Sequence, residues 1–275
     1  MKKCGLQLYS LKDVINSDFK GVLKQVKDIG YTGVEFASGN YGGLSAAELK
    51  SYLKEVGLDP ISSHIQTAKI AEHVEYAKEL GLRYLIDPMA PMGNREEALA
   101  FAEKLNLAGE ICAKAGILFG YHNHRHEFVK DGGEYLFETL ILNTDSSLVC
   151  FQLDVGWAAC AGVDVPSFIN KYPERFKLIH IKECGHVGGA EPLPDFSIYP
   201  KDENGRPQIP PEVIKKFQDE AKWNVKGGEG VIDWNVVVEA AAKNGATDFI
   251  VEREYDYAGD IFKCVKEDFD FVSKI

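Results

Sequence analysis

The sequence predicts an α/β protein folded as a single (β/α)8 barrel, or TIM barrel, that spans residues 1–275. Three observations support this fold class. Short apolar segments alternate with amphipathic helical segments along the whole chain, which indicates a parallel sheet. Most of the predicted strands start roughly 23–35 residues apart, which is the length of one βα unit. No Gly-x-Gly-x-x-Gly motif follows the first strand, so a doubly wound open sheet is the weaker alternative.

The individual elements follow from local sequence signals. Strands are expected at residues 4–9, 32–36, 60–65, 83–87, 117–124, 149–155, 177–182 and 248–254. A glycine ends several of the preceding helices, where the backbone turns left-handed; these are Gly30, Gly57, Gly81, Gly116 and Gly245. Ser45 stands three residues before Glu48, and Asn94 three before Glu97, which is the capping-box spacing of a helix start. In the first helix Phe19, Val22, Leu23, Val26 and Ile29 form one apolar stripe.

The regular spacing is interrupted between the seventh and eighth strands, at residues 185–226. Six of the eleven prolines fall within residues 185–211, which favours a long Pro/Gly-rich loop. Because loops at the carboxyl ends of barrel strands carry function, this insertion is a candidate lid over the site. A flexible surface insertion is the alternative. The following KGGEGVIDW stretch predicts a glycine turn and then a helix capped by Asp233.

The composition restricts the partners of the chain. With 31 basic and 42 acidic residues the formal net charge is −11, which disfavours nucleic acid and anionic membranes. The apolar stretch after Lys2 and Lys3 is short and fits a first strand better than a signal peptide. The six cysteines form no Cys-x-x-Cys pair, so reduced thiols in the cytoplasm are expected. A small-molecule substrate is the expected partner, and a homo-oligomer is compatible with the sequence.

Polar side chains gather at the ends of the predicted strands, where a barrel has its active site. Alternate residues of a strand face the same side, so parity identifies the side chains that face the barrel mouth. These are Gln7, Glu35, His64, His122, His124, Gln152, Asp154, His180, Lys182, Glu252 and Glu254. Each would be unfavourable in an apolar core without a partner, so together they predict a polar, concave site. His126, the third histidine of GYHNHRHEF, lies beyond the strand in a loop.

Histidine and carboxylate groups together suit a divalent metal such as Mn²⁺, Fe²⁺, Co²⁺ or Zn²⁺. Two alternatives remain open from the residues alone. The first is an acid/base site without a metal, and the second is a structural polar cluster. In the second case Asp154 caps the segment that follows it, and Glu252 pairs with Arg253 or Lys182.

The strand ends resemble one enzyme family over nearly the whole chain. The segments are GLQLYSLKD, GYTGVEF, GYHNHRHEF, FQLDVGWAACAG, LIHIKE, GGEGVIDW and IVERE. They are similar to the sugar phosphate isomerase/epimerase family, the xylose isomerase-like or endonuclease IV-like TIM barrels. The segments from the sixth and seventh strands are the most specific.

This resemblance implies one divalent metal at the barrel mouth, with Mn²⁺ expected and Co²⁺, Fe²⁺, Zn²⁺ or Mg²⁺ as alternatives. Relatives bind it through Glu, Asp, His and Glu from strands five to eight, and the last three match Asp154, His180 and Glu252. His122 stands where the first glutamate is usual, and Glu127 would reach that position only from the loop. Trp157 stands where relatives often carry a substrate-binding histidine, and it either stacks on a sugar ring or packs at the loop base.

The expected activity is isomerisation or epimerisation of a sugar or keto-sugar. A base removes the proton next to a carbonyl, and the metal stabilises the resulting enediolate. The expected metal ligands are His122, Asp154, His180 and Glu252, and the expected catalytic groups are His122, His124, Lys182 and Glu252. Substrate contacts are expected from Gln7, Glu35, His64, Glu127, Trp157, Glu183 and Glu254.

The histidine at position 122 makes a second activity plausible. Without the usual glutamate, a two-glutamate epimerase mechanism is in doubt, which favours a lyase or dehydratase acting on keto-sugars, keto-inositols or 3-keto-glycosides. Phosphodiester cleavage is disfavoured by the acidic charge. A sugar-binding barrel without catalytic activity is the remaining alternative.

Overall fold

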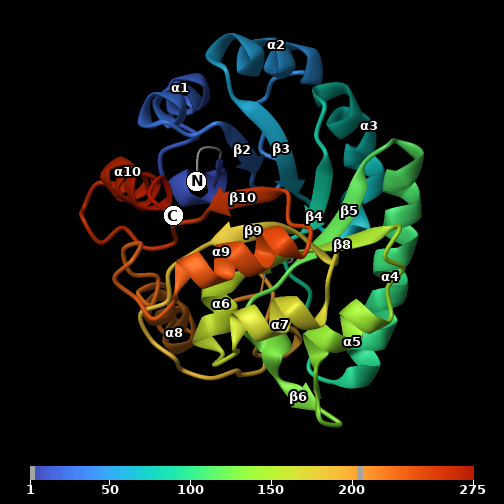
Figure 1. Ribbon diagram of the computed structural model, residues 1–275. Helices are drawn as coiled ribbons and strands as arrows, with labels where there is room; N and C mark the ends of the chain where they lie inside the picture. The colour runs from blue at the N-terminus through green and yellow to red at the C-terminus, as the bar shows by residue number, and fades with distance from the viewer. Residues whose placement is uncertain (1–3, 203–206) are drawn as a thin grey trace.

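Eight parallel strands close into a barrel (Figure 1). The computed structural model describes residues 4–202 and 207–275. Around the barrel the strands are β1 (Gly5–Gln7), β2 (Gly33–Phe36), β3 (Asp59–His64), β4 (Tyr84–Asp87), β5 (Leu118–His122), β8 (Val149–Asp154), β9 (Phe176–Ile181) and β10 (Asp248–Val251). Each strand pairs in parallel with its neighbours, and β10 pairs with β1 to close the ring. The predicted fold class and the eight predicted strands are confirmed.

Helices cover the outside of the barrel (Figure 1). They are α1 (Phe19–Ile29), α2 (Ala46–Val56), α3 (Ile70–Leu80), α4 (Arg95–Lys114), α5 (Leu136–Leu142), α6 (Val155–Cys160), α7 (Val165–Lys171), α8 (Pro211–Ala221), α9 (Trp234–Lys243) and α10 (Ile261–Val272). Short 3₁₀ helices are η1 (Leu8–Leu11), η2 (Thr67–Lys69), η3 (His126–Phe128) and η4 (Phe196–Ile198), and β6 (Lys130–Asp131) pairs with β7 (Glu134–Tyr135). The predicted stripe of α1 packs against the core.

The backbone conformation and the capping contacts at the helix ends agree with most of the predicted signals. All five predicted glycines have a positive φ, from 76° at Gly116 to 126° at Gly30. Ser45 and Glu48 form the reciprocal capping box. At α4 the box is incomplete: Asn94 accepts from the Glu97 N–H, but the Glu97 carboxylate accepts from Gly93 instead.

The insertion between β9 and β10 is only partly loop. The expectation of a loop throughout 185–226 is wrong for Pro211–Ala221, which form α8. Pro211 suits the first turn of a helix, and Val213 and Phe217 are half-buried at helical spacing. Asp233 caps α9 as predicted, because its carboxylate accepts from the Val236 N–H at 3.3 Å.

The barrel interior has an apolar layer and a polar layer. The apolar layer is Ile61, Tyr84, Ile86, Cys150, Leu178 and Ile250. Toward the carboxyl ends of the strands the buried side chains become polar, as with Glu35, His64, Gln152 and His180. The apolar layer therefore forms the base on which the polar side chains are supported.

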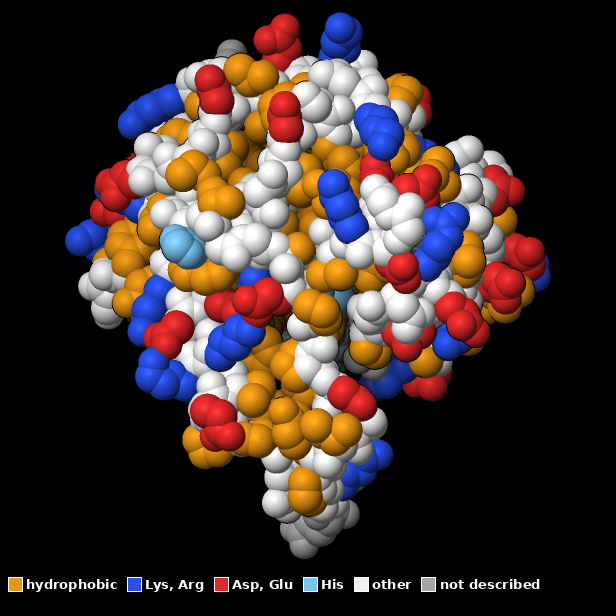
Figure 2. All heavy atoms as spheres, turned by 90° about the horizontal axis from the view of Figure 1, so that it is seen from below, with side chains coloured by type: hydrophobic (Ala, Val, Ile, Leu, Met, Phe, Trp, Pro, Cys, Tyr) orange, Lys and Arg blue, Asp and Glu red, His pale blue; other side chains and the backbone are white. Residues whose placement is uncertain are grey.

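Acidic and basic side chains are interspersed on the face seen in Figure 2, and neither kind forms a continuous patch there. Hydrophobic side chains gather on a projection at the lower edge of that view. Within residues 4–202 and 207–275, the helices are too short or too polar to cross a bilayer.

Candidate metal and substrate site

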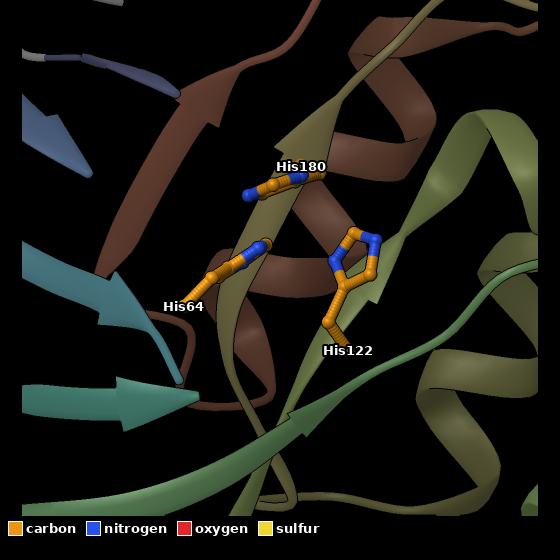
Figure 3. A group of neighbouring side chains, drawn as sticks. All are labelled: His64, His122 and His180. Carbon is orange, nitrogen blue, oxygen red and sulfur yellow. The ribbon is translucent and has the colours of Figure 1, made fainter. Parts of the chain in front are cut away.

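Four side chains at the ends of successive barrel strands form the centre of the site. Donor atoms of His122, Asp154, His180 and Glu252 all lie within 4.8 Å of one another, and the four residues are buried. They come from the ends of β5, β8, β9 and β10. A second set overlaps the first, because His64, His122 and His180 meet the same criterion. Figure 3 shows these three imidazole rings directed toward one another.

The two carboxylate oxygens of Asp154 have different roles: one caps a helix, and the other faces the metal-ligand candidates. Oδ1 accepts the Trp157 N–H at 2.7 Å and so caps α6. Oδ2 is buried and accepts no hydrogen bond from the described residues, although Lys182 Nζ lies 3.1 Å away. A buried carboxylate oxygen of this kind is a typical position for a cation. The cap that was one alternative for Asp154 is therefore present, together with an oxygen that accepts no hydrogen bond from the described residues.

Backbone contacts fix Asp154 beside its neighbours. The Asp154 N–H donates to Asn123 Oδ1 at 3.0 Å, and Asn123 Nδ2 donates back to the Asp154 carbonyl at 3.2 Å. Gly156 lets α6 approach the segment after β9, because a Cβ atom there would lie 2.5 Å from the Lys182 carbonyl oxygen. This close approach brings the Asp154 and Lys182 side chains together.

Glu35 is the acceptor at the centre of the polar layer. Its fully buried carboxylate is contacted by Gln7 at 2.6 Å, Ser62 at 2.6 Å, Gln152 at 2.7 Å, His180 at 2.7 Å and His64 at 3.0 Å. Because His180 Nε2 is engaged by Glu35, its Nδ1 turns toward Glu252 at 3.1 Å and the metal-ligand candidates. Gln7 and Glu35 do not line the cavity. Glu35 instead orients His180, and Gln7 donates to Glu35.

The protonation states differ within the cluster. Burial and the neighbouring histidines lower the pKa of His122 well below its usual value, which leaves a neutral imidazole. Burial opposes charge on His180, but the Glu35 and Glu252 carboxylates outweigh it and raise its pKa to about 10. Burial would raise the pKa of Glu252, yet Lys182 and His180 hold it well below the usual value. Burial raises the pKa of Asp154 to about 6.

Lys182 is surrounded by carboxylates. Its Nζ lies 2.6 Å from Glu254, 2.9 Å from Glu252 and 3.1 Å from Asp154. It also lies 4.9 Å from the centre of the Trp157 ring. Burial opposes the charge, but these carboxylates raise the pKa of Lys182 well above its usual value, so the group is an ammonium.

His124 and Trp157 form the adjacent wall of the cavity, with ring centres 5.9 Å apart. His124 Nδ1 and Trp157 Nε1 are buried and have no hydrogen-bond partner among residues 4–202 and 207–275. Both atoms are therefore free to bind substrate oxygens. His64 and Glu254 also line this cavity, which makes them available to a substrate.

Glu127 and Glu183 do not line the cavity. Glu127 accepts from the Tyr121 hydroxyl at 2.6 Å and from the His124 N–H at 2.9 Å. Glu183 accepts from Trp234 Nε1 at 2.8 Å and from the Gly228 N–H at 2.9 Å. Both carboxylates therefore hold loops in place. His126 lies beyond β5 as expected, in η3, where its side chain is buried and contacts the Ala90 carbonyl.

Two residues of the site had no role assigned from the sequence. Gln152 has inward parity, and its Oε1 contacts His64 at 2.8 Å and His122 at 3.0 Å. Arg125 gave no signal, yet it is buried and donates to Glu220 of α8 at 2.5 Å. It fixes the insertion to the end of β5, a contact between residues too distant in sequence to predict.

The donor set fits a divalent ion. Two imidazoles and two carboxylates from four strands match the ligand preferences of Mn²⁺, Fe²⁺, Co²⁺ and Zn²⁺. The neutral His122 imidazole has a lone pair for such an ion, and Asp154 Oδ2 accepts no hydrogen bond from the described residues, although the Lys182 ammonium lies 3.1 Å away. His180 would be held in orientation by Glu35, as metal-binding histidines commonly are.

A family model described as "Xylose isomerase-like TIM barrel" matches residues 23–275. The chain belongs to this family. This xylose isomerase-like barrel is 27% identical to a sugar phosphate isomerase/epimerase from Parabacteroides distasonis, with a TM-score of 0.77 and coverage of 100% of this chain and 99% of that one. The resemblance to this family predicted from the strand ends is confirmed.

Two further comparisons are with a curated protein and with a solved structure. An inosose dehydratase from Geobacillus kaustophilus is 25% identical over 194 residues, covering 60% of this chain and 62% of that protein. The matched part is thus less than two thirds of that relative. The crystal structure of IOLI protein with a zinc atom shares the fold at 14% identity, with a TM-score of 0.69 and coverage of 99% of this chain and 97% of that one.

Proposed function

We propose that this xylose isomerase-like barrel is a divalent-metal-dependent isomerase or epimerase of a sugar or keto-sugar. The observation that supports this most is the convergence of His122, Asp154, His180 and Glu252 within 4.8 Å, with Asp154 Oδ2 buried and accepting no hydrogen bond from the described residues. When bound, the ion would polarise the substrate carbonyl and stabilise negative charge on its oxygen. Mn²⁺ is the proposed ion, because oxygen and imidazole ligands suit it.

The residues around the cluster supply the proton transfers. Glu252 is the proposed base that removes the proton beside the carbonyl, because its carboxylate is ionised and lines the cavity. Its contacts with His180 and Lys182 use Oε2, so Oε1 is the oxygen assigned to the substrate. Return of the proton at the neighbouring carbon gives isomerisation, and return from the opposite face gives epimerisation. His124 and Trp157 would bind substrate hydroxyls through their unpaired ring nitrogens.

A dehydratase is the second candidate, and His122 favours it. With histidine at the end of β5, the cluster lacks a second glutamate that could serve as base on the opposite face. Elimination requires one base and one acid, and the Lys182 ammonium, 2.9 Å from Glu252, could donate the proton to a departing hydroxyl. The inosose dehydratase relatives support the same alternative.

The first experiment measures the metal. The protein is purified without added metal, and bound Mn, Fe, Co and Zn are quantified by plasma mass spectrometry for wild type, His180→Ala and Glu252→Gln. We expect about one ion per chain in the wild type and a loss of at least tenfold in both variants. A folded wild-type protein that binds none of these ions would rule the proposal out.

The second experiment separates the two activities. Keto-sugars and keto-inositols are incubated with the metal-loaded enzyme in D₂O and followed by NMR. Deuterium incorporation without elimination indicates isomerisation or epimerisation, whereas loss of water indicates a dehydratase.

The six cysteines are free and buried, which supports a reducing, cytoplasmic location as part of the proposal.

A further inference from the structure

The cavity above the metal-ligand candidates is larger than the reacting part of a small sugar. Its volume is about 880 Å³, near the upper end of the roughly 300–1,000 Å³ found for ligand pockets. His122, Glu252 and Trp157 line its inner end. The same cavity extends to the insertion between β9 and β10, so a substrate held at the inner end leaves the outer part to be filled.

The outer wall of the cavity has an apolar part. It is lined by Leu193, Phe196, Ile214 and Phe217 from the insertion, and by Met89 from the segment after β4. The Phe196 and Phe217 ring centres lie 6.3 Å apart at an interplanar angle of 37°. Met89 is 41% exposed and Ile214 is 43% exposed, which is unfavourable for large apolar side chains. A ligand that covered them would gain hydrophobic burial.

Three of the basic side chains that line the cavity are paired with carboxylates. Arg125 contacts Glu220 at 2.5 Å and Glu191 at 3.3 Å. Lys216 pairs with Glu191. Lys222, at the end of α8, pairs with Asp219 at 2.7 Å. A phosphate group would have to displace acidic partners to reach these three cations. Lys12, in the segment after β1, also lines the cavity, and its Nζ lies 4.7 Å from the centre of the Tyr9 ring. The wall formed by the insertion is therefore better suited to an apolar group than to a phosphate.

We propose that the substrate is a sugar that carries a flat apolar substituent, such as an aromatic aglycone. The sugar ring lies at the inner end, against the strand-end cluster and Trp157. The substituent lies between the insertion and Met89, against Phe196, Phe217 and Leu193. This inference rests on the proposed function, since it assigns the reacting sugar to the same cluster.

Matched pairs of glycosides test the apolar subsite without requiring turnover. Methyl and phenyl β-glycosides of glucose, galactose and mannose, together with glucose 6-phosphate, are titrated into the metal-loaded protein by calorimetry. For at least one sugar the phenyl glycoside is expected to bind about tenfold to a hundredfold more tightly than the methyl glycoside, from burial of one aromatic ring. Glucose 6-phosphate is expected to bind no better than the methyl glycosides.

Variants locate the preference in the structure. Phe217→Ala and Leu193→Ala are expected to reduce the methyl-to-phenyl ratio of dissociation constants to below about threefold. Leu142→Ala is the matched control, because Leu142 is 58% exposed on α5 and does not line the cavity. It should retain the wild-type ratio, and circular dichroism verifies that each variant is folded.

The inference is overturned if no phenyl glycoside is preferred, if the two cavity variants keep the wild-type ratio, or if glucose 6-phosphate binds most tightly. Bound metal and deuterium exchange are measured on the same preparations. A phenyl preference in a protein without metal or exchange would refute the proposed function and retain the subsite. Metal and exchange without a phenyl preference would refute the subsite alone.

Discussion

Substitution of Glu35 by glutamine tests how the polar layer supports the metal-ligand candidates. The carboxylate has five contacting groups, of which Gln7, His180 and His64 lie at Oε1 and Ser62 and Gln152 at Oε2. A glutamine keeps one acceptor oxygen, and its amide group faces the other set of donors. The Ser62 hydroxyl can rotate and accept from an amide, but the donating amide of Gln152 cannot.

At least one buried donor therefore loses its acceptor, which is expected to destabilise the protein by about 1–3 kcal/mol. This corresponds to a lower Tm by about 2–4 °C for each kcal/mol in a domain of roughly this size. Glu35 also orients His180, so the dissociation constant of the metal should rise by about tenfold to a hundredfold.

The assay combines a chelator competition titration with Mn²⁺ or Zn²⁺ and thermal unfolding of the metal-free protein. Glu110→Gln is the matched control, since Glu110 is exposed on α4, and it should leave both quantities unchanged. A metal dissociation constant within about threefold of wild type, together with a Tm within about 1 °C, would show that Glu35 does not support His180 as argued above.

Three further predictions concern other parts of the structure. His64→Ala should retain the metal content that His180→Ala loses, measured by plasma mass spectrometry; equal losses would favour the three-histidine set instead. Arg253→Met should lower the urea-derived free energy of unfolding by about 3–5 kcal/mol, because it leaves the buried Asp268 unpaired, and a change below about 1 kcal/mol contradicts this. Burial opposes ionisation of Glu138, but its hydrogen bonds from Lys171 and from the backbone hold its pKa below the usual 4.5. The Tm of Glu138→Gln should therefore be lower than that of wild type at pH 7, and the gap should narrow as the pH falls through and below 4.5; a gap that stays constant with pH would count against the ionised form.

Much of the fold could be predicted because its signals are local. A helix that ends at a glycine such as Gly81 and is followed by a short apolar strand is visible within about a dozen residues of sequence. Strand ends were less predictable. β5 stops at His122 and β10 at Val251, earlier than expected, because their lengths follow from pairing with neighbouring strands. Helix α8 was missed because the prolines around it resemble those of a loop.

The candidate site was partly predictable for a geometric reason. The carboxyl ends of parallel strands meet at one end of a barrel, so strand-end parity places His122, Asp154, His180 and Glu252 among the side chains that face the barrel mouth. The resemblance to the family was needed to select these four as metal-ligand candidates. The roles of other polar residues depend on partners distant in sequence. Glu183 accepts from Trp234, 51 residues away, and no local pattern indicates that contact. Whether an inward carboxylate binds a substrate or supports the structure is therefore decided by packing.

The Arg125–Glu220 ion pair has a consequence for how this protein could diversify. The metal-ligand candidates lie at the ends of the barrel strands, whereas the outer wall of the cavity is formed largely by the insertion. Arg125 follows β5 and links the barrel to the insertion. An insertion taken from a relative could therefore pack in the same position if it had an acidic residue at the place of Glu220. Recombination of this segment between relatives would then alter which molecules are accepted while the strand-end chemistry is inherited unchanged.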